Sequence, residues 1–182
     1  MNMHSREQEI ISMMRVSDTR DKGFTLLMET YKERIYWHIR RLVVSHEDSE
    51  DILQETFINA YRYAGSFNGQ SRLYTWLYRI ATNECIRWHK KVKGKKTSVS
   101  EISINRISEP GEHDLESRES MLHKFQKCIL MLPEKQRIVF NLRYYDELSY
   151  EDIGEITKTS VNSLKSSYHY ACEKIKEMLR NQ

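Results

Sequence analysis

Residues that break helices are rare in this chain. Only six glycines and two prolines occur among its 182 residues, which is about a third of what average usage would supply. Charged side chains make up 30% of the sequence, and this composition favours helices over a turn-rich sandwich or barrel. We therefore expect an all-α fold of two small helical domains joined by a flexible linker, the second ending in a helix-turn-helix.

Three apolar stripes with helical spacing predict the first domain. One stripe covers residues 24–42, and a second follows a helix start near Asp48, whose side chain can cap free backbone N–H groups. Residues 65–70 contain two glycines and predict a loop. Ser71 is positioned to cap a third helix that ends near Lys93.

Periodicity disappears after Gly94. The segment up to Arg118 is rich in small polar residues, contains Pro110-Gly111 and is acidic at its end, so it predicts a solvated linker. The expected boundaries are 1–20 for an N-terminal extension, 21–94 for the first helical domain, 95–118 for the linker and 119–182 for the second domain.

The second domain ends with a short helix, a tight turn and a long helix. Ser149 and Asp152 have the spacing of a capping box and open the short helix. A turn at residues 157–160 then leads into a helix over 161–179. This order is typical of a DNA-binding helix-turn-helix, although such hairpins also occur as purely structural units.

Short polar groups and one lysine lie on the outward face near the start of this last helix. They can hydrogen-bond base edges or phosphates in a major groove, or they form an ordinary solvated face. The candidate residues are Asn162, Ser163, Lys165, Ser166 and His169.

The third helix of the first domain combines aromatic rings with positive charge. Residues 72–96 hold eight basic residues against one acidic residue. Rings beside cations suit a site for unstacked bases. We expect Tyr74, Tyr78 and Trp88 to be exposed, whereas Trp76 lies on the inward stripe.

An acidic strip lies on the second helix of the first domain. Its members recur at spacings of three and four and share one helix face: Asp48, Asp51, Gln54 and Glu55. The strip is too acidic to face DNA, so it is either solvated surface or the docking site of a basic protein.

Catalysis is not indicated. The seven histidines show no metal-binding spacing and no phosphate-binding glycine motif is present, so we expect no cofactor, no metal and no enzymatic activity. Three separate cysteines fit a reducing cytoplasm. We find neither a secretion signal nor a membrane-spanning run, and we expect a cytoplasmic protein without membrane insertion.

Two blocks of sequence resemble the bacterial RNA polymerase sigma factors of the extracytoplasmic-function (ECF) subfamily. The first block, DSEDILQETFI from Asp48 with FNGQS and YTWLYRIA after it, is similar to sigma region two. The second, LPEKQR from Leu132 with YEDIG and LKS after it, is similar to region four.

The resemblance implies a role for each candidate surface. In the family, the acidic strip docks on the clamp of the largest subunit of core RNA polymerase, region two binds the minus-ten promoter element and its flipped-out bases, and region four reads the minus-thirty-five element. The minus-ten role falls on Asn68, Gln70, Ser71, Arg72, Tyr74, Arg79, Asn83 and Arg87, and the minus-thirty-five role on the five candidates of the last helix. An anti-sigma factor is a further expected partner.

Ser167 and Tyr170 depart from the family pattern, because many relatives carry arginines there. Fewer cations should weaken the grip on phosphates. Cys172 stands where a basic residue is common.

Other functions remain open at this point. The chain could be a stand-alone helix-turn-helix regulator that dimerises on a palindrome, or a regulator that sequesters polymerase without initiating. It could also be a metal-dependent nuclease that uses Asp48 and Asp51.

Overall fold

The computed structural model describes residues 3–67, 69–93 and 118–181. These residues form α-helices and two short 3-10 helices, and no strand occurs among them. The helices are α1 (Met3–Arg15), η1 (Ser17–Thr19), α2 (Arg20–Val43), α3 (His46–Tyr63), η2 (Ala64–Ser66), α4 (Leu73–Lys93), α6 (Arg118–Met131), α7 (Glu134–Tyr144), α8 (Tyr150–Thr157) and α9 (Val161–Arg180). The expected linker falls almost entirely outside the described residues.

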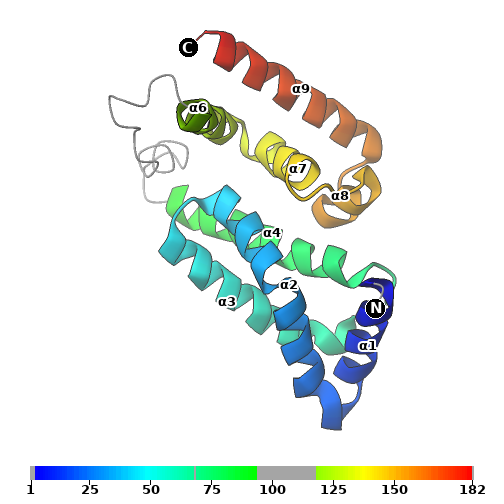
Figure 1. Ribbon diagram of the computed structural model, residues 1–182. Coiled ribbons are helices and arrows are strands. Elements are labelled where there is room, and N and C mark those ends of the chain that lie inside the picture. The colour runs from blue at the N-terminus through cyan, green and yellow to red at the C-terminus, as the bar shows by residue number, and fades with distance from the viewer. Residues whose placement is uncertain (1–2, 68, 94–117, 182) are drawn as a thin grey trace.

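Helices α1 to α4 form one unit and helices α6 to α9 form a second (Figure 1). Within the first unit α2 packs against α1, α3 and α4. Its core takes the inward stripes of all four helices, with Leu27, Ile35, Leu73 and Leu77 completely buried. The apolar spacing that predicted the helices over 24–42 and 71–93 therefore marks the faces that are buried.

Helix α1, which lies within the expected N-terminal extension, contributes to this core. Helix α1 buries Ile10 and Met14 in the same apolar cluster as α2 to α4. Its Glu7 is also buried, where it accepts a hydrogen bond from the Tyr31 hydroxyl at 2.8 Å and from the Tyr74 backbone N–H at 3.4 Å. The segment that we expected to be an N-terminal extension thus contains a helix whose Glu7 bonds to both α2 and α4.

Two helix starts differ from the sequence expectation. Ser45 caps α3, and its hydroxyl accepts from the Asp48 backbone N–H at 3.3 Å, so Asp48 lies in the first turn instead of at the cap. Helix α4 begins at Leu73, and the Trp76 N–H donates to the Arg72 carbonyl. Arg72 therefore occupies the position that we expected for Ser71.

The second unit ends in the expected pair of helices. Ser149 caps α8 by accepting from the Asp152 N–H at 3.0 Å, and its own hydroxyl donates to the Asp152 carboxylate. Lys158 closes α8 in a left-handed conformation with φ of 56°. A Cβ on Gly154 would lie 3.0 Å from the Thr159 carbonyl oxygen, so glycine lets the turn fold back closely before α9.

The two units touch each other along α4. Helix α8 lies against α4, and α7 lies against α2 (Figure 1). One apolar cluster contains buried side chains from both units, whereas the buried side chains of a second, smaller cluster all come from the second unit. The expectation of two helical domains thus needs an addition, because the domains are packed together.

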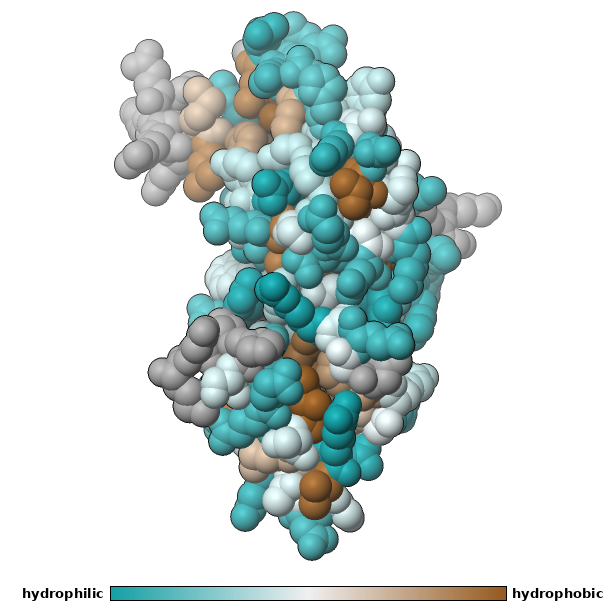
Figure 2. Space-filling model, turned by 90° about the vertical axis from the view of Figure 1, so that its right-hand side faces the viewer, coloured by the Kyte–Doolittle hydropathy of each residue, from teal (hydrophilic) through white to brown (hydrophobic). Residues whose placement is uncertain are grey.

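The outer surface is mostly hydrophilic. Figure 2 shows polar side chains over most of one face, with apolar side chains in small patches between them. No helix in the described ranges combines the length and the apolarity that crossing a membrane requires.

Candidate functional site

The acidic strip of α3 is open to solvent along most of its length. Asp51, Gln54 and Glu55 are exposed, and Asp48 is half-buried. The Asp48 carboxylate accepts a hydrogen bond from the Trp88 indole N–H at 3.2 Å. One end of the strip is thereby tied to α4, while the other three side chains remain available at the surface.

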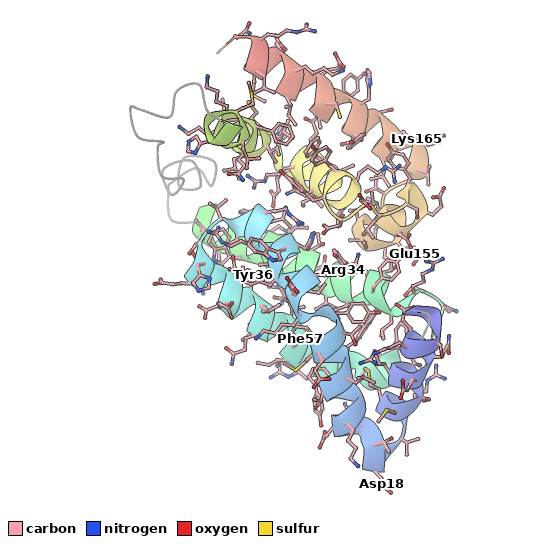
Figure 3. The ribbon with its side chains drawn as sticks, in the orientation of Figure 1. Asp18, Arg34, Tyr36, Phe57, Glu155 and Lys165 are labelled. Atoms are coloured by element: carbon pink, nitrogen blue, oxygen red, sulfur yellow. The ribbon has the colours of Figure 1, made fainter. Side chains whose placement is uncertain are left out.

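A groove of about 540 Å³ lies beside the strip, between α2 and α3. The aromatic part of its lining is ordered by edge contacts: the Phe24 ring centroid is 6.2 Å from that of Phe57 and 5.1 Å from that of Tyr61. Phe57 projects from α3 towards α2 (Figure 3). Asp51 and Gln54 stand on its rim, and two basic side chains also line it, so the groove joins an apolar floor to a charged edge that includes part of the acidic strip.

Three of the predicted minus-ten residues share one face of α4. Arg79, Asn83 and Arg87 follow each other at intervals of four residues, and Asn83 and Arg87 are exposed. The Arg87 guanidinium lies 2.9 Å from both carboxylate oxygens of Glu84, which also accepts from Asn59. Arg87 is therefore oriented by Glu84 while its side chain stays 70% exposed.

Tyr74 is not on that face. It is half-buried, its backbone is tied to α1 and its hydroxyl meets Asp152 of α8. Burial, followed by the hydrogen bond and the charge of Asp152, raises the pKa of Tyr74 above its ordinary value. The exposed Arg72 lies next to it, with Nη1 3.4 Å from the Tyr74 hydroxyl.

The loop before α4 brings two further predicted residues near Arg72. Gln70 is exposed and Ser71 is half-buried. Asn68 lies outside the described residues. The predicted minus-ten set is thus divided between the loop, the outer face of α4 and the side of α4 that meets α8.

The expectation of exposed rings on α4 is wrong for Tyr78. This side chain is completely buried, and its hydroxyl donates to Asp146 of the second unit at 3.2 Å. Trp88 is half-buried against Asp48. Trp76 is 6% exposed and packs on Phe67, as its place on the inward stripe predicted.

All five candidates of the last helix lie exposed near the start of α9: Asn162, Ser163, Lys165, Ser166 and His169. Ser160 caps the helix, because its hydroxyl oxygen accepts a hydrogen bond from the Ser163 backbone N–H. The Ser160 hydroxyl also donates to the Ser163 hydroxyl at 2.9 Å. Successive residues of an α-helix are rotated by about 100°, so the other four side chains share one face of α9 and Ser163 lies at the edge of that face. Lys165 Nζ is 5.9 Å from the centre of the Tyr150 ring, and it lies with Glu155 at the α8 end of the unit (Figure 3).

The departures from the family pattern lie further along α9. Tyr170 is 60% exposed, while Ser167 and Cys172 are half-buried. Within the ranges that the structure describes, no three His, Cys, Asp or Glu side chains gather closely enough to hold a metal ion.

Comparison with known proteins decides the family. The model of Sigma-70 region 2 matches residues 27–94, and the model of Sigma-70 region 4 matches residues 122–175. The RNA polymerase sigma-H factor of Pseudomonas aeruginosa is 32% identical over 99% of this chain and 97% of its own length. The ECF RNA polymerase sigma factor SigW of Bacillus subtilis is 34% identical over 87% of this chain and 90% of its own length. The chain belongs to the ECF sigma factors.

Solved structures agree with this assignment. The sigma factor RpoE of Bartonella quintana, in complex with the anti-sigma factor NepR, has a TM-score of 0.68 at 26% identity and covers 87% of this chain and 98% of its own. CnrH, in complex with the cytosolic domain of CnrY, has the same fold, with a TM-score of 0.72 over 97% of this chain and 99% of its own at 15% identity. These findings favour a sigma factor over a stand-alone regulator.

Sequence reasoning missed a polar cluster between the two units of this sigma factor. Asp146, which follows α7, places its carboxylate against His38 and Arg41 of α2 and Tyr78 of α4. One sequence signal existed, because His38 lies on the buried stripe of α2, three positions after Ile35. A histidine on a buried stripe needs a polar partner, but nothing in the sequence indicated that Asp146 would supply it.

Proposed function

We propose that this sigma factor binds core RNA polymerase through α3 and directs it to promoters by recognising the minus-ten element with the first unit and the minus-thirty-five element with α9, so that transcription is initiated. The observation that carries the proposal is the exposed acidic strip at the rim of an apolar groove. Its role is one of binding and involves no catalysis.

The polymerase-facing part combines two kinds of attraction. Asp51, Gln54 and Glu55 offer negative charge and hydrogen-bond acceptors to a basic partner, which gives orientation and rapid association. The groove between Phe24 and Phe57 can accept apolar side chains of a helix laid across it. The clamp of the largest polymerase subunit is the partner that we assign to this surface.

The promoter-facing part of the first unit is mainly cationic. Arg72, Arg79 and Arg87 can follow the phosphates of the strand, and the exposed Asn83 offers an amide to base edges. Gln70, Ser71 and Asn68 belong to the loop that we assign to unpaired bases. The half-buried ring of Tyr74 becomes available for stacking when Asp152 moves away from it.

The promoter-facing part of the second unit is the start of α9. Asn162 and His169 can read base edges in the major groove, while Lys165 and Ser166 contact phosphates. With few cations in this group, we expect α9 to bind DNA well only when polymerase holds the first unit at the promoter.

A regulatory partner is also part of the proposal. The RpoE structure contains an anti-sigma factor, and we expect a protein of that kind to bind this chain. Such a role places the protein in the cytoplasm, where promoter DNA and polymerase are found.

The decisive experiment measures binding to purified core RNA polymerase. The double variant Asp51→Lys, Glu55→Lys reverses two exposed charges of the strip and leaves the bond between Asp48 and Trp88 intact. We expect binding at least about tenfold weaker than that of the wild type, because like charges across an interface repel.

The control is Glu9→Lys, Glu177→Lys, which makes the same change in net charge at exposed positions of α1 and α9. It should bind as the wild type does. If both double variants bind equally well, the strip is not the docking surface. If the wild type does not bind polymerase, the proposed function is wrong.

A further inference from the structure

A second groove, of about 620 Å³, lies between the C-terminal half of α2 and the helices α6 and α7 (Figure 1). Its α2 side is formed by Trp37, Arg40 and Arg41, which recur at spacings of three and four and share one helix face. Its α7 side is formed by Asn141 and Tyr145, and side chains of α6 complete the lining. The volume is in the range of sites that bind small organic ligands.

The amide of Asn141 is the group that points to a ligand. The residue is completely buried, and among the described residues neither its Oδ1 nor its Nδ2 has a hydrogen-bond partner. Native structures rarely leave a buried amide unpaired, because its desolvation is then not compensated. A ligand that presents a hydrogen-bond donor beside an acceptor satisfies both atoms at once, in the way that an asparagine amide pairs with the edge of adenine.

Positive charge lines the same groove. Arg41 is already engaged, because its Nη1 donates to the Asp146 carboxylate at 3.0 Å and its guanidinium lies 4.6 Å from the centre of the Tyr145 ring. Arg40 is half-buried and takes part in none of the ion pairs between described residues. None of the described residues that line the groove is acidic. Arg40 is therefore available to an anion, and a guanidinium can bind two phosphate oxygens at once.

Aromatic rings form a wall of the groove. The Tyr36 ring lies edge-on to those of Trp37 and His46, with centroids 5.4 Å and 6.1 Å away, and its hydroxyl is 2.9 Å from His46 Nδ1. These contacts orient Tyr36 on α2 (Figure 3), while Trp37 remains 49% exposed. A large ring that borders a groove and is open to solvent suits stacking on a flat ligand.

We propose that the groove between α2, α6 and α7 binds a nucleoside phosphate, whose base pairs with the Asn141 amide and stacks on Trp37 while its phosphate pairs with Arg40. The groove offers partners for a flat ring, for a donor beside an acceptor and for an anion, and a nucleotide has all of these features. A nucleoside lacks the anion and inorganic phosphate lacks the ring. The groove is separate from the acidic strip and from the residues that we assign to promoter DNA, so this inference does not depend on the proposed function.

Calorimetric titration of the full-length protein tests the inference. The probes are AMP, GMP, CMP and UMP, and the matching nucleosides and inorganic phosphate serve for comparison. We expect at least one nucleotide to bind with a dissociation constant below about 1 mM, and its nucleoside and inorganic phosphate to bind at least about tenfold more weakly.

Asn141→Leu nearly keeps the volume of the side chain and removes both of its polar atoms. It should weaken nucleotide binding at least about tenfold. It should not lower the melting temperature of the protein without nucleotide, because an unpaired buried amide does not stabilise the fold.

Arg40→Gln should weaken nucleotide binding at least about fivefold and reduce the preference for the nucleotide over its nucleoside, since the guanidinium is the partner of the phosphate. Arg6→Gln, at a half-buried position of α1, is the matched control and should bind as the wild type does. Arg87→Gln tests the rival location, because a nucleotide held by the promoter-facing arginines would bind this variant weakly.

The inference is refuted if none of the nucleotides binds, if a folded Asn141→Leu or Arg40→Gln protein binds as tightly as the wild type, or if Arg87→Gln loses binding. If Asn141→Leu melts at a lower temperature or does not fold, its amide serves the fold and Arg40→Gln decides alone. The role as a sigma factor stands in each case, because binding to core polymerase is measured separately.

Discussion

The Asp146 carboxylate lies 3.1 Å from Nδ1 of His38, although 108 positions separate the two residues in the sequence. Both side chains are nearly inaccessible to solvent, with 5% and 0% exposed. Burial would by itself raise the pKa of Asp146, but the hydrogen bonds and positive charges of His38 and Arg41 outweigh it and hold that pKa below its ordinary value. The charged carboxylate is therefore a stabilising part of the contact between the two units.

Removal of this charge should open the molecule. Asp146→Asn keeps the shape of the side chain but leaves His38 and Arg41 without their anion, which we expect to weaken the contact by about 3 kcal/mol. Small-angle X-ray scattering should show a larger radius of gyration for the variant. Asp18→Asn, at an exposed position of η1, is the matched control and should scatter as the wild type does. Equal radii for all three proteins would show that Asp146 does not hold the units together.

Acid should open the wild type in the same way. A group whose pKa is lower in the closed form than in the open form stabilises the closed form above the open-form pKa, and that stabilisation disappears as the pH falls. For Asp146 the loss should occur below about pH 5. Scattering between pH 6 and pH 3 should show a transition in the wild type that Asp146→Asn has largely lost. A transition of the same size in both proteins would assign it to other carboxylates.

The reactivity of the native cysteines can report on separation of the two units without engineered thiols. Cys85 is buried on the α4 surface that faces the second unit, and burial raises the pKa of its thiol above the ordinary value. Cys128 is buried in the separate cluster of α6, α7 and α9, and Cys172 is half-buried. We expect a thiol reagent such as Ellman's reagent to modify Cys172 first in the wild type.

In Asp146→Asn, Cys85 should react several-fold faster while the rate at Cys128 stays the same. Peptide mapping after timed alkylation assigns the rates. Equal acceleration at both sites would indicate general unfolding instead of separation of the units.

The seam between α1 and α2 depends on Gly23. A Cβ at this position would lie 2.7 Å from Met13 Cβ and 2.9 Å from the Met14 backbone nitrogen. Gly23→Ala should therefore lower the free energy of unfolding by about 1–3 kcal/mol, as overpacking does. Gly65→Ala is the control, since no atom lies within 4 Å of the added carbon. Urea unfolding followed by circular dichroism measures both, and equal midpoints would contradict the close packing of α1.

Local patterns predicted much of the fold. The apolar stripe over residues 24–42 predicted α2, and the spacing of Ser149 and Asp152 predicted the cap of α8. These features depend on neighbours within a few positions. The start of α3 was misplaced because Ser45 and Asp48 are both good capping residues, and sequence alone does not decide between them.

The two halves of the candidate site differ in how far they could be predicted. The exposed acids of α3 and the exposed polar group at the start of α9 lie opposite apolar stripes, so periodicity located them. Tyr78 was misjudged because helical spacing shows which face meets the core of its own unit. It does not show that a second face is covered by another unit.

The sequence by itself determined the helices after α1, the two units, the acidic and basic surfaces and the resemblance to sigma factors, because each is encoded in residues close together in the chain. Only the tertiary structure decided that α1 belongs to the core, that Tyr78 is buried and that Asp146 meets His38. The physical reason is that these contacts join residues far apart in the chain. The free energy of these contacts depends on how the folded units fit together, and the local periodicity of the sequence does not predict that fit.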